Sequence, residues 1–324
     1  MEHPAWKGIF AILVTPFTEA NELDEKGLRH LVDFACDRKL DGVVVLGSNG
    51  EFPYLTTEEK LRVMKVAADQ ARGRLPVLAG ASDYGTDQAV AYAKAAREAG
   101  CDGVMAALPL YFAVNLAQAK AHVQALAAEG ALPVFFYYFP ETTGLVLKPE
   151  ELAEIAALPG VPGAKLTVTN KSFLKKTIAA TRPSNWAVFV GTSFLLLDNL
   201  EFGGKGIFCP LPLIGPKDIR GIYDAFMAGD KKPARALQDK VLRALPIMTG
   251  MSLPPAVLAA GFKLVSGRRY QGPPARMKPA HHLVKEALRL QGHPITPKVR
   301  RPFASATPQE SELLKKTLAD LGWL

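Results

Sequence analysis

The sequence predicts an α/β protein, a (β/α)8 TIM barrel followed by a C-terminal helical segment. Eight short apolar runs recur along the first two thirds of the chain, and segments with helical periodicity separate most of them. After Pro216 the strand-like runs stop. The alternation alone also fits a doubly wound open sheet, but eight strand–helix units in about 225 residues match the size of a barrel.

The expected strands are continuously apolar instead of alternating. This pattern is typical of parallel strands that helices cover. We expect strands at Ile9–Val14, Gly42–Leu46, Pro76–Ala79, Gly103–Ala106, Pro133–Tyr138, Gly163–Leu166, Ala187–Val190 and Gly206–Cys209.

The expected helices carry apolar residues three and four positions apart, and two of them carry capping signals. Asp24 is a candidate N-cap for a helix over Asp24–Lys39, and Thr56 with Glu59 forms a capping box. Further helices are expected at Thr86–Ala99, Leu116–Glu129, Leu152–Leu158 and Lys171–Thr181.

The last third of the chain predicts helices only, from Asp218 to about Leu290 and again from Gln309. We therefore divide the chain into a barrel with the active site (1–225) and a C-terminal helical segment (226–324). The uncharged stretch Ala244–Phe262 is long enough to span a bilayer. Gly250 and three prolines interrupt it, which favours two buried half-helices, and we expect no membrane partner.

Composition excludes a disordered or fibrous protein, since 48% of the 324 residues are hydrophobic and 22% charged. The net charge of +8 raises nucleic-acid binding as a possibility. The densest basic stretches, 263–269 and 298–301, are interrupted by Pro, Gly or Ser and lack aromatic residues in series. We therefore expect no nucleic-acid partner; small anionic substrates fit the charge better.

The number and spacing of the cysteines indicate the cellular compartment in which the protein folds. The three cysteines, Cys36, Cys101 and Cys209, lie far apart and form no CxxC pair, which is typical of a reducing compartment. The segment Met1–Lys7 has no signal-peptide pattern. We expect a cytoplasmic protein.

In a (β/α)8 barrel the active groups come from the C-terminal ends of strands and the loops that follow. After the second strand the chain reads Gly47-Ser48-Asn49-Gly50-Glu51. The amides of Ser48 and Asn49 could hold a carboxylate or phosphate there. The alternative is an ordinary βα turn with helix-capping residues.

Lys165 is the most informative residue, because a lysine in a short buried strand is costly. Burial favours the neutral amine, which attacks a carbonyl to form a Schiff base. The alternative is an ammonium group that reaches water at the strand end. Tyr111 and Tyr137, at the ends of the fourth and fifth strands, are candidates for catalysis or for the core.

Metal and cofactor sites are not expected. The pair His281-His282 lacks partners at metal-ligand spacing and is expected on a solvated helix face. Asp41, Asp83 and Asp102 lie beside strands without the convergent acidic set that magnesium prefers.

Four motifs in register resemble the dihydrodipicolinate synthase/N-acetylneuraminate lyase family. They are Gly47–Glu51, Pro109–Tyr111, Tyr137–Pro140 with Thr143-Gly144, and Gly163–Lys165. The resemblance runs from about Gly8 to Gly215, and Val299–Pro302 is similar to the family's closing Arg-Pro segment. It implies a class I Schiff-base lyase on a (β/α)8 barrel, without cofactor, assembled as a homotetramer or dimer.

The resemblance also implies roles for individual residues. Lys165 would form the Schiff base with pyruvate or another 2-oxo acid, and Tyr137 would be the acid/base group. Ser48 would relay protons between Tyr137 and Tyr111, the latter from a neighbouring subunit.

Substrate contacts are implied in the same way. The amides of Ser48 and Asn49 would bind the substrate carboxylate, and the Ile207 backbone would line the site. Thr167 matches a hydroxyl found in aldolase-type members.

This sequence departs from the synthases at positions that bear on specificity. Thr142 stands where they carry an arginine for the aldehyde partner's carboxylate, and a hydroxyl cannot replace that cation. Tyr138 and Leu110 replace an asparagine and a tyrosine, which predicts a larger, more apolar pocket mouth. Gly47–Pro53 is similar to the 4-hydroxy-2-oxoglutarate aldolase branch.

We therefore expect a class I aldolase that cleaves a 4-hydroxy-2-oxo acid and releases pyruvate. Dihydrodipicolinate synthase and a 2-keto-3-deoxy sugar-acid dehydratase or aldolase are alternatives that use the same lysine. A further alternative is a non-catalytic barrel that binds a 2-oxo acid.

Overall fold

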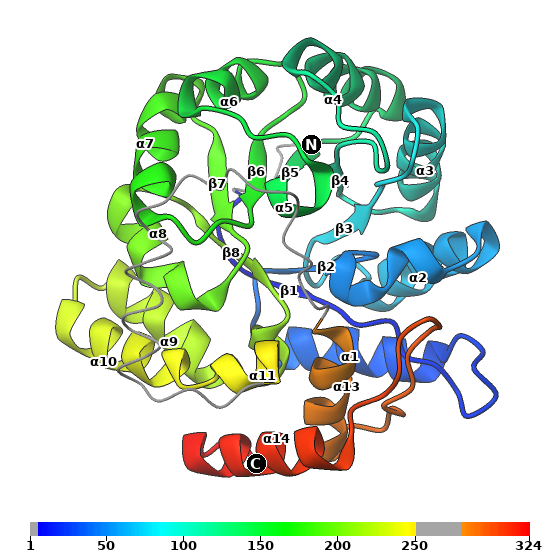
Figure 1. Cartoon of the computed structure of the whole chain (residues 1–324), viewed down its shortest axis with the longest axis vertical. Coiled ribbons are helices and arrows are strands. Elements are labelled where there is room, and N and C mark those ends of the chain that lie inside the picture. Colours follow the sequence, from blue (N-terminus) through cyan, green and yellow to red (C-terminus); the bar gives the residue numbers. More distant parts are fainter. Residues whose placement is uncertain (1–5, 251–279) are drawn as a thin grey trace.

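The computed structural model describes residues 6–250 and 280–324. Its central feature is a closed barrel of eight parallel strands in sequential order, with helices around the outside (Figure 1). The predicted (β/α)8 barrel is confirmed. The strands are β1 (Gly8–Ile12), β2 (Gly42–Val45), β3 (Val77–Gly80), β4 (Gly103–Ala107), β5 (Val134–Tyr138), β6 (Gly163–Leu166), β7 (Ala187–Val190) and β8 (Gly206–Cys209).

The barrel closes between β1 and β8, where Gly8 is the register partner of Gly206. A Cβ on Gly206 would lie 1.9 Å from the carbonyl oxygen of Gly8. Only glycine therefore allows the two strands to approach this closely at the seam.

Aromatic rings fill the barrel interior at the level of its N-terminal end. Phe189 stacks on Phe208 with ring centroids 4.2 Å apart, and Phe10 and Phe135 contact both of them. Trp6 adds an edge contact to Phe135 at 4.9 Å. The barrel is thus a packed core and not a pore, so any substrate must enter from the opposite end.

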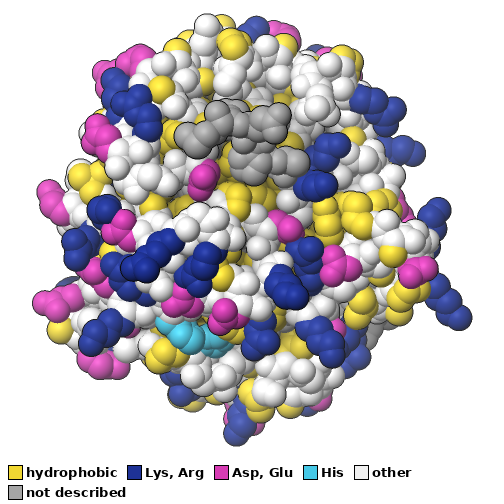
Figure 2. Space-filling model, turned by 180° about the vertical axis from the view of Figure 1, so that it is seen from behind, with side chains coloured by type: hydrophobic (Ala, Val, Ile, Leu, Met, Phe, Trp, Pro, Cys, Tyr) yellow, Lys and Arg dark blue, Asp and Glu magenta, His cyan; other side chains and the backbone are white. Residues whose placement is uncertain are grey.

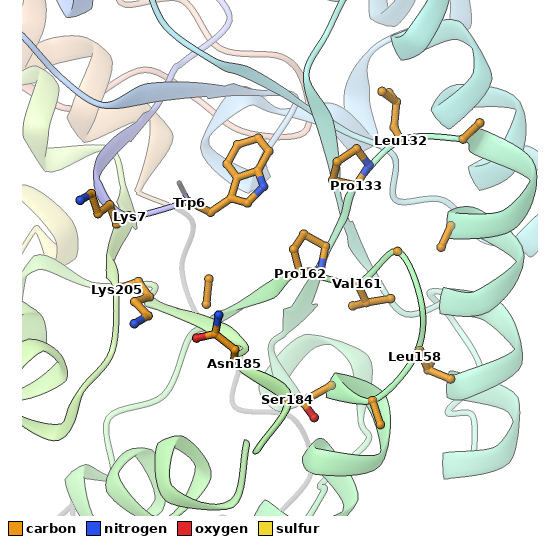
Figure 3. Close-up of a pocket in the computed structure, with 16 residues that line it drawn as sticks. Trp6, Lys7, Leu132, Pro133, Leu158, Val161, Pro162, Ser184, Asn185 and Lys205 are labelled. Carbon is orange, nitrogen blue, oxygen red and sulfur yellow. The ribbon is translucent and has the colours of Figure 1, made fainter. Parts of the chain in front are cut away.

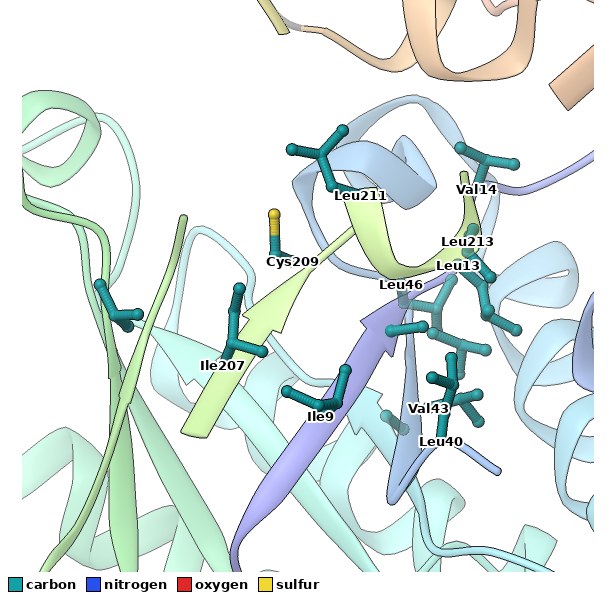
Figure 4. Close-up of a cluster of buried hydrophobic side chains, with 14 of the residues drawn as sticks. Ile9, Leu13, Val14, Leu40, Val43, Leu46, Ile207, Cys209, Leu211 and Leu213 are labelled. Atoms are coloured by element: carbon teal, nitrogen blue, oxygen red, sulfur yellow. The ribbon is translucent and has the colours of Figure 1, made fainter. Parts of the chain in front are cut away.

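The larger hydrophobic cluster lies between the strands and the surrounding helices (Figure 4). Alternate strand residues such as Ile9, Val43 and Ile207 point outward into it. Because successive side chains of a strand point to opposite faces, the residues between them face the barrel interior.

Helices follow most of the strands. Those of the barrel layer are α1 (Glu25–Asp37), α2 (Thr57–Ala71), α3 (Thr86–Ala99), α4 (Leu116–Gly130), α5 (Pro140–Thr143), α6 (Pro149–Ala156), α7 (Lys171–Thr181), α8 (Leu196–Phe202) and α9 (Pro216–Met227). The Asp24 side chain accepts from the Gly27 amide, and the Thr56–Glu59 capping box forms. Both predicted caps are confirmed.

The sequence gives weaker signals for α6 and α8. The α6 helix begins at Pro149, three residues before the predicted start, since Pro is well suited to a first helical turn. No helix was expected at α8, whose first five residues are all buried and therefore show no amphipathic stripe.

The C-terminal helices α10 (Lys231–Leu242), α11 (Leu245–Thr249), α13 (His281–Leu290) and α14 (Pro308–Leu321) complete the described chain. The helices α13 and α14 pack against each other and against α11 (Figure 1). The proposed boundary at residues 225 and 226 falls within α9. The first predicted half-helix of Ala244–Phe262 corresponds to α11, and the remainder lies outside the described residues. None of the described helices combines the length and apolarity that a bilayer span requires.

Charged side chains of both signs are spread over the face drawn in Figure 2, where Lys and Arg alternate with Asp and Glu. Two cations of the basic stretch near the C-terminus are paired, Lys298 with Glu19 and Arg300 with Glu59. This pairing reduces the positive potential that the stretch presents to a ligand.

Candidate active site

Lys165 lies on β6 with its side chain inside the barrel, and it is 3% exposed. Its register partners are Tyr137 on β5 and Phe189 on β7. The Lys165 Nζ lies over the Tyr137 ring, 3.9 Å from the ring centroid. Because the face of an aromatic ring attracts a cation, the ring fixes the position of the amine.

Gly191, directly after β7, leaves the space that the Lys165 side chain needs. A Cβ at Gly191 would lie 3.1 Å from Lys165 Cε and 2.2 Å from Thr167 Oγ1. Lys165 and Thr167 therefore meet at this glycine. Gly191 is not among the site residues predicted from the sequence, where its one signal is a glycine at the end of the seventh strand.

The Thr167 hydroxyl is buried and has no hydrogen-bond partner among the described residues. A buried hydroxyl without a partner costs free energy, so such groups need an explanation. Its place beside Lys165 makes it available to a bound substrate.

Ser48 and Asn49 open the 3-10 helix η1 (Ser48–Gly50) after β2. The Gly50 and Glu51 amides donate to Gly47 O and Ser48 O at 2.9 and 3.2 Å. The first amides of a helix have no intrahelical acceptor, which leaves those of Ser48 and Asn49 for a ligand. In an eight-stranded ring β2 lies opposite β6, so this turn and Lys165 lie on opposite sides of the barrel mouth.

Tyr111 does not join Lys165 and Tyr137 within a single chain, because its side chain is 86% exposed. Its backbone has φ of +89°, which is uncommon for a residue other than glycine. The neighbouring Phe112 is 78% exposed and contacts the Tyr111 ring edge-on at 4.8 Å. Two large rings are thus presented together outside their own barrel.

Ile207 lies on β8 with its side chain pointing outward among buried hydrophobic residues (Figure 4). Its register partners are Ile9 and Val190. Any contribution of Ile207 to the site therefore comes from its backbone.

The prediction that Tyr138 widens the pocket mouth is wrong. Its side chain points away from the barrel interior, stacks on Phe173, and its hydroxyl accepts from the Leu147 amide at 3.0 Å. Burial raises the pKa of Tyr138 to about 12. The reason is the strand pleat, which sends Tyr137 inward and its neighbour outward.

Thr142 lies exposed on α5, directly after β5. Its hydroxyl donates to the Phe139 carbonyl at 3.0 Å. The side chain at this position is therefore a neutral hydroxyl that bonds to its own turn.

A separate pocket of about 1030 Å³ lies at the opposite end of the barrel (Figure 3). Its labelled residues Lys7, Pro133, Pro162 and Lys205 each come shortly before a strand. Because active sites of (β/α)8 enzymes lie at the C-terminal ends of the strands, this pocket is not the catalytic one.

Comparison with known families matches residues 5–263 to the dihydrodipicolinate synthetase family. The chain belongs to this family. It is therefore a class I aldolase or lyase of the dihydrodipicolinate synthetase family.

Relatives within the family cover from about three quarters to nearly all of the chain. A 4-hydroxy-tetrahydrodipicolinate synthase of Syntrophus aciditrophicus is 33% identical over 98% of this chain and 99% of its own. A synthase of the same name from Maridesulfovibrio salexigens is 35% identical over 73% of this chain and 80% of its own. The crystal structure of YagE, an E. coli K12 prophage protein of the family in complex with pyruvate, is 25% identical with a TM-score of 0.86. It covers 99% of this chain and 100% of its own.

Proposed function

We propose that this family member cleaves a 4-hydroxy-2-oxo acid and releases pyruvate. The observation that carries the proposal is the buried Lys165 with its Nζ over the Tyr137 ring. An amine in this position can attack a ketone, and a phenol lies within the same small volume to move protons.

The first step joins the substrate to the protein. The lone pair of the Lys165 Nζ adds to the C2 carbonyl carbon, and loss of water gives a protonated imine. The amides of Ser48 and Asn49 hold the C1 carboxylate, and the free Thr167 hydroxyl bonds to the bound substrate.

Cleavage follows because the imine accepts electrons. Tyr137 gives its proton to the departing water and is left as a phenolate. The phenolate then takes the proton of the C4 hydroxyl while the C3–C4 bond breaks. The aldehyde leaves, and the electron pair of that bond forms an enamine with the imine carbon. Protonation at C3 and hydrolysis of the imine then release pyruvate and restore Lys165.

The proton relay requires a second chain. The exposure of Tyr111 supports a role in a neighbouring subunit's site, with Ser48 linking Tyr111 to Tyr137. We propose a homodimer or homotetramer in which each site is completed by its neighbour.

A second candidate activity is that of 4-hydroxy-tetrahydrodipicolinate synthase, the name carried by relatives at 33% and 35% identity. Thr142 disfavours it, because a neutral hydroxyl stands at the position where the synthases are expected to hold their aldehyde partner's carboxylate with an arginine. A 2-keto-3-deoxy sugar-acid dehydratase or aldolase would use the same lysine. Identification of the reaction products distinguishes it from the other two activities.

The test is reduction with borohydride in the presence of pyruvate, followed by intact mass and peptide mapping. We expect a pyruvyl adduct on Lys165, and none in Lys165→Ala or on Lys171, whose half-exposed side chain pairs with Asp198. Release of pyruvate from 4-hydroxy-2-oxoglutarate then supports the aldolase, and condensation of pyruvate with aspartate semialdehyde supports the synthase. A folded protein without any adduct would favour a barrel that binds 2-oxo acids without catalysis.

A further inference from the structure

A carboxylate is buried directly behind the turn that holds Ser48 and Asn49. Glu51 follows η1 with φ of +59°, and its side chain is 0% exposed. Its Oε1 accepts from the Lys285 Nζ at 2.5 Å, and its Oε2 accepts from the Arg300 amide at 2.7 Å. Both donors belong to the C-terminal segment, far from Glu51 in sequence.

Lys285 lies on α13, which packs against η1, and its side chain is 0% exposed. Its Nζ also donates to the Lys298 carbonyl at 2.6 Å and lies 4.1 Å from the Phe17 ring centroid. Burial lowers the pKa of Lys285 to about 8. The ammonium is thus enclosed by three separate segments.

Arg300 and His281, both from the C-terminal segment, also lie beside Glu51. The Arg300 guanidinium lies 4.4 Å from the Phe17 ring centroid and pairs with Glu59. His281 Nε2 lies 3.9 Å from the Glu51 carboxylate. Burial lowers the pKa of His281 to about 3, so it is neutral at pH 7. The expectation of a solvated position is wrong for His281, which is 1% exposed.

A buried ion pair tolerates little displacement, because an ammonium or carboxylate separated from its partner inside a protein is left without compensation. Glu51 also belongs to the turn itself, since its amide donates to the Ser48 carbonyl. Movement of Glu51 would therefore move the backbone of Ser48 and Asn49.

We propose that Glu51 and Lys285 are positioning residues that hold the Ser48–Asn49 amides in place for the substrate carboxylate. The C-terminal segment is then part of the binding machinery, although none of its described residues is assigned a contact with substrate. This inference rests on the proposed function, in which those amides bind the C1 carboxylate.

The experiment measures how much pyruvate is needed for half-maximal borohydride trapping on Lys165. In Lys285→Met we expect this concentration to rise about tenfold or more, because small misplacements of binding groups are costly. The adduct yield at saturating pyruvate should stay at the wild-type level, since Lys165 and Tyr137 are untouched. Loss of fold alone would lower the yield instead.

The double variant Glu51→Gln with Lys285→Met guards against misfolding, because it leaves no unpaired buried charge. We expect it to fold, as judged by circular dichroism, and still to need about tenfold more pyruvate. Gln291→Leu is the matched control. Gln291 lies at the end of α13, and its side chain donates hydrogen bonds to the carbonyl oxygens of Ile214 and Trp323. The substitution removes these bonds and so loosens the C-terminal segment at a place distant from the Ser48–Asn49 turn.

Each outcome has one meaning. A folded double variant that traps pyruvate at the wild-type concentration overturns the positioning role while leaving the proposed function intact. An equal rise in Gln291→Leu also overturns it, because loosening of the segment would then be sufficient. Absence of an adduct in the wild-type protein overturns the proposed function itself.

Discussion

Lys165 and Tyr137 are register partners on adjacent strands, and the amine of one lies 3.9 Å from the ring centroid of the other. The strand pleat turns both side chains into the barrel at the same level. The contact uses the face of the Tyr137 ring and not its hydroxyl, which stays available to move a proton. One tyrosine can therefore both hold the amine and move a proton.

This arrangement separates the two roles of Tyr137. Tyr137→Phe keeps the ring and removes the hydroxyl, so pyruvate should still be trapped on Lys165. Turnover should fall about 10²–10⁴-fold, the usual range for a general acid–base group. Steady-state kinetics alongside borohydride trapping checks this. Tyr138→Phe is the neighbouring control, since its hydroxyl lies outside the barrel; an unchanged rate in Tyr137→Phe would exclude the acid–base role.

Gly191 should tolerate no side chain. In Gly191→Ala the new methyl group would displace Thr167 and the Lys165 side chain, and overpacking of this kind costs about 1–3 kcal/mol. We expect turnover to fall at least tenfold, by analogy with other small misplacements of catalytic groups. Gly85→Ala is the control, because a Cβ there meets nothing within 4 Å. Wild-type turnover in a folded Gly191→Ala protein would contradict the close fit.

Tyr111 should matter for activity and not for the stability of its own chain. Since the side chain is 86% exposed, Tyr111→Phe should leave thermal unfolding unchanged. Turnover should nevertheless fall about 10²-fold or more if the hydroxyl takes part in proton transfer in a neighbouring site. Steady-state kinetics of the wild type and Tyr111→Phe measures this effect, with light scattering to check that both have the same oligomeric state. An unaltered rate would show that Tyr111 takes no part in the proton relay.

Buried histidines should make the fold sensitive to acid. Burial lowers the pKa of His122 to about 4, whereas the unfolded chain has the ordinary value near 6.5. As the pH falls below 6.5 the unfolded state binds a proton that the folded state does not, so stability decreases down to about pH 4. From pH 7 to pH 5 this group should lower the free energy of unfolding by about 2 kcal/mol.

Chemical denaturation at pH 7 and pH 5 measures this effect. His122→Gln should reduce the pH dependence by the contribution of one group, although it loses the contact between His122 Nδ1 and Thr86 Oγ1 at 3.0 Å. His281, whose pKa is lowered to about 3, adds to the same trend. A pH dependence identical in wild type and His122→Gln would show that His122 does not titrate as the structure implies.

The sequence by itself determined the barrel and the centre of the candidate site. Strand runs, helix periodicity and the caps at Asp24 and Thr56 are local properties, and the structure confirms them within a few residues. The pairing of Lys165 with Tyr137 could also be anticipated, because they lie at equivalent heights on consecutive strands of a parallel barrel.

Tertiary structure alone decided what surrounds that centre. The Lys285–Glu51 pair joins residues 234 positions apart, and no local pattern in either segment indicates the other. The same packing buries His281, and the close approach of Thr167 and Lys165 leaves little room for a side chain at Gly191. Local sequence specifies which face of an element is apolar, whereas the partner that covers a polar group depends on how distant elements pack.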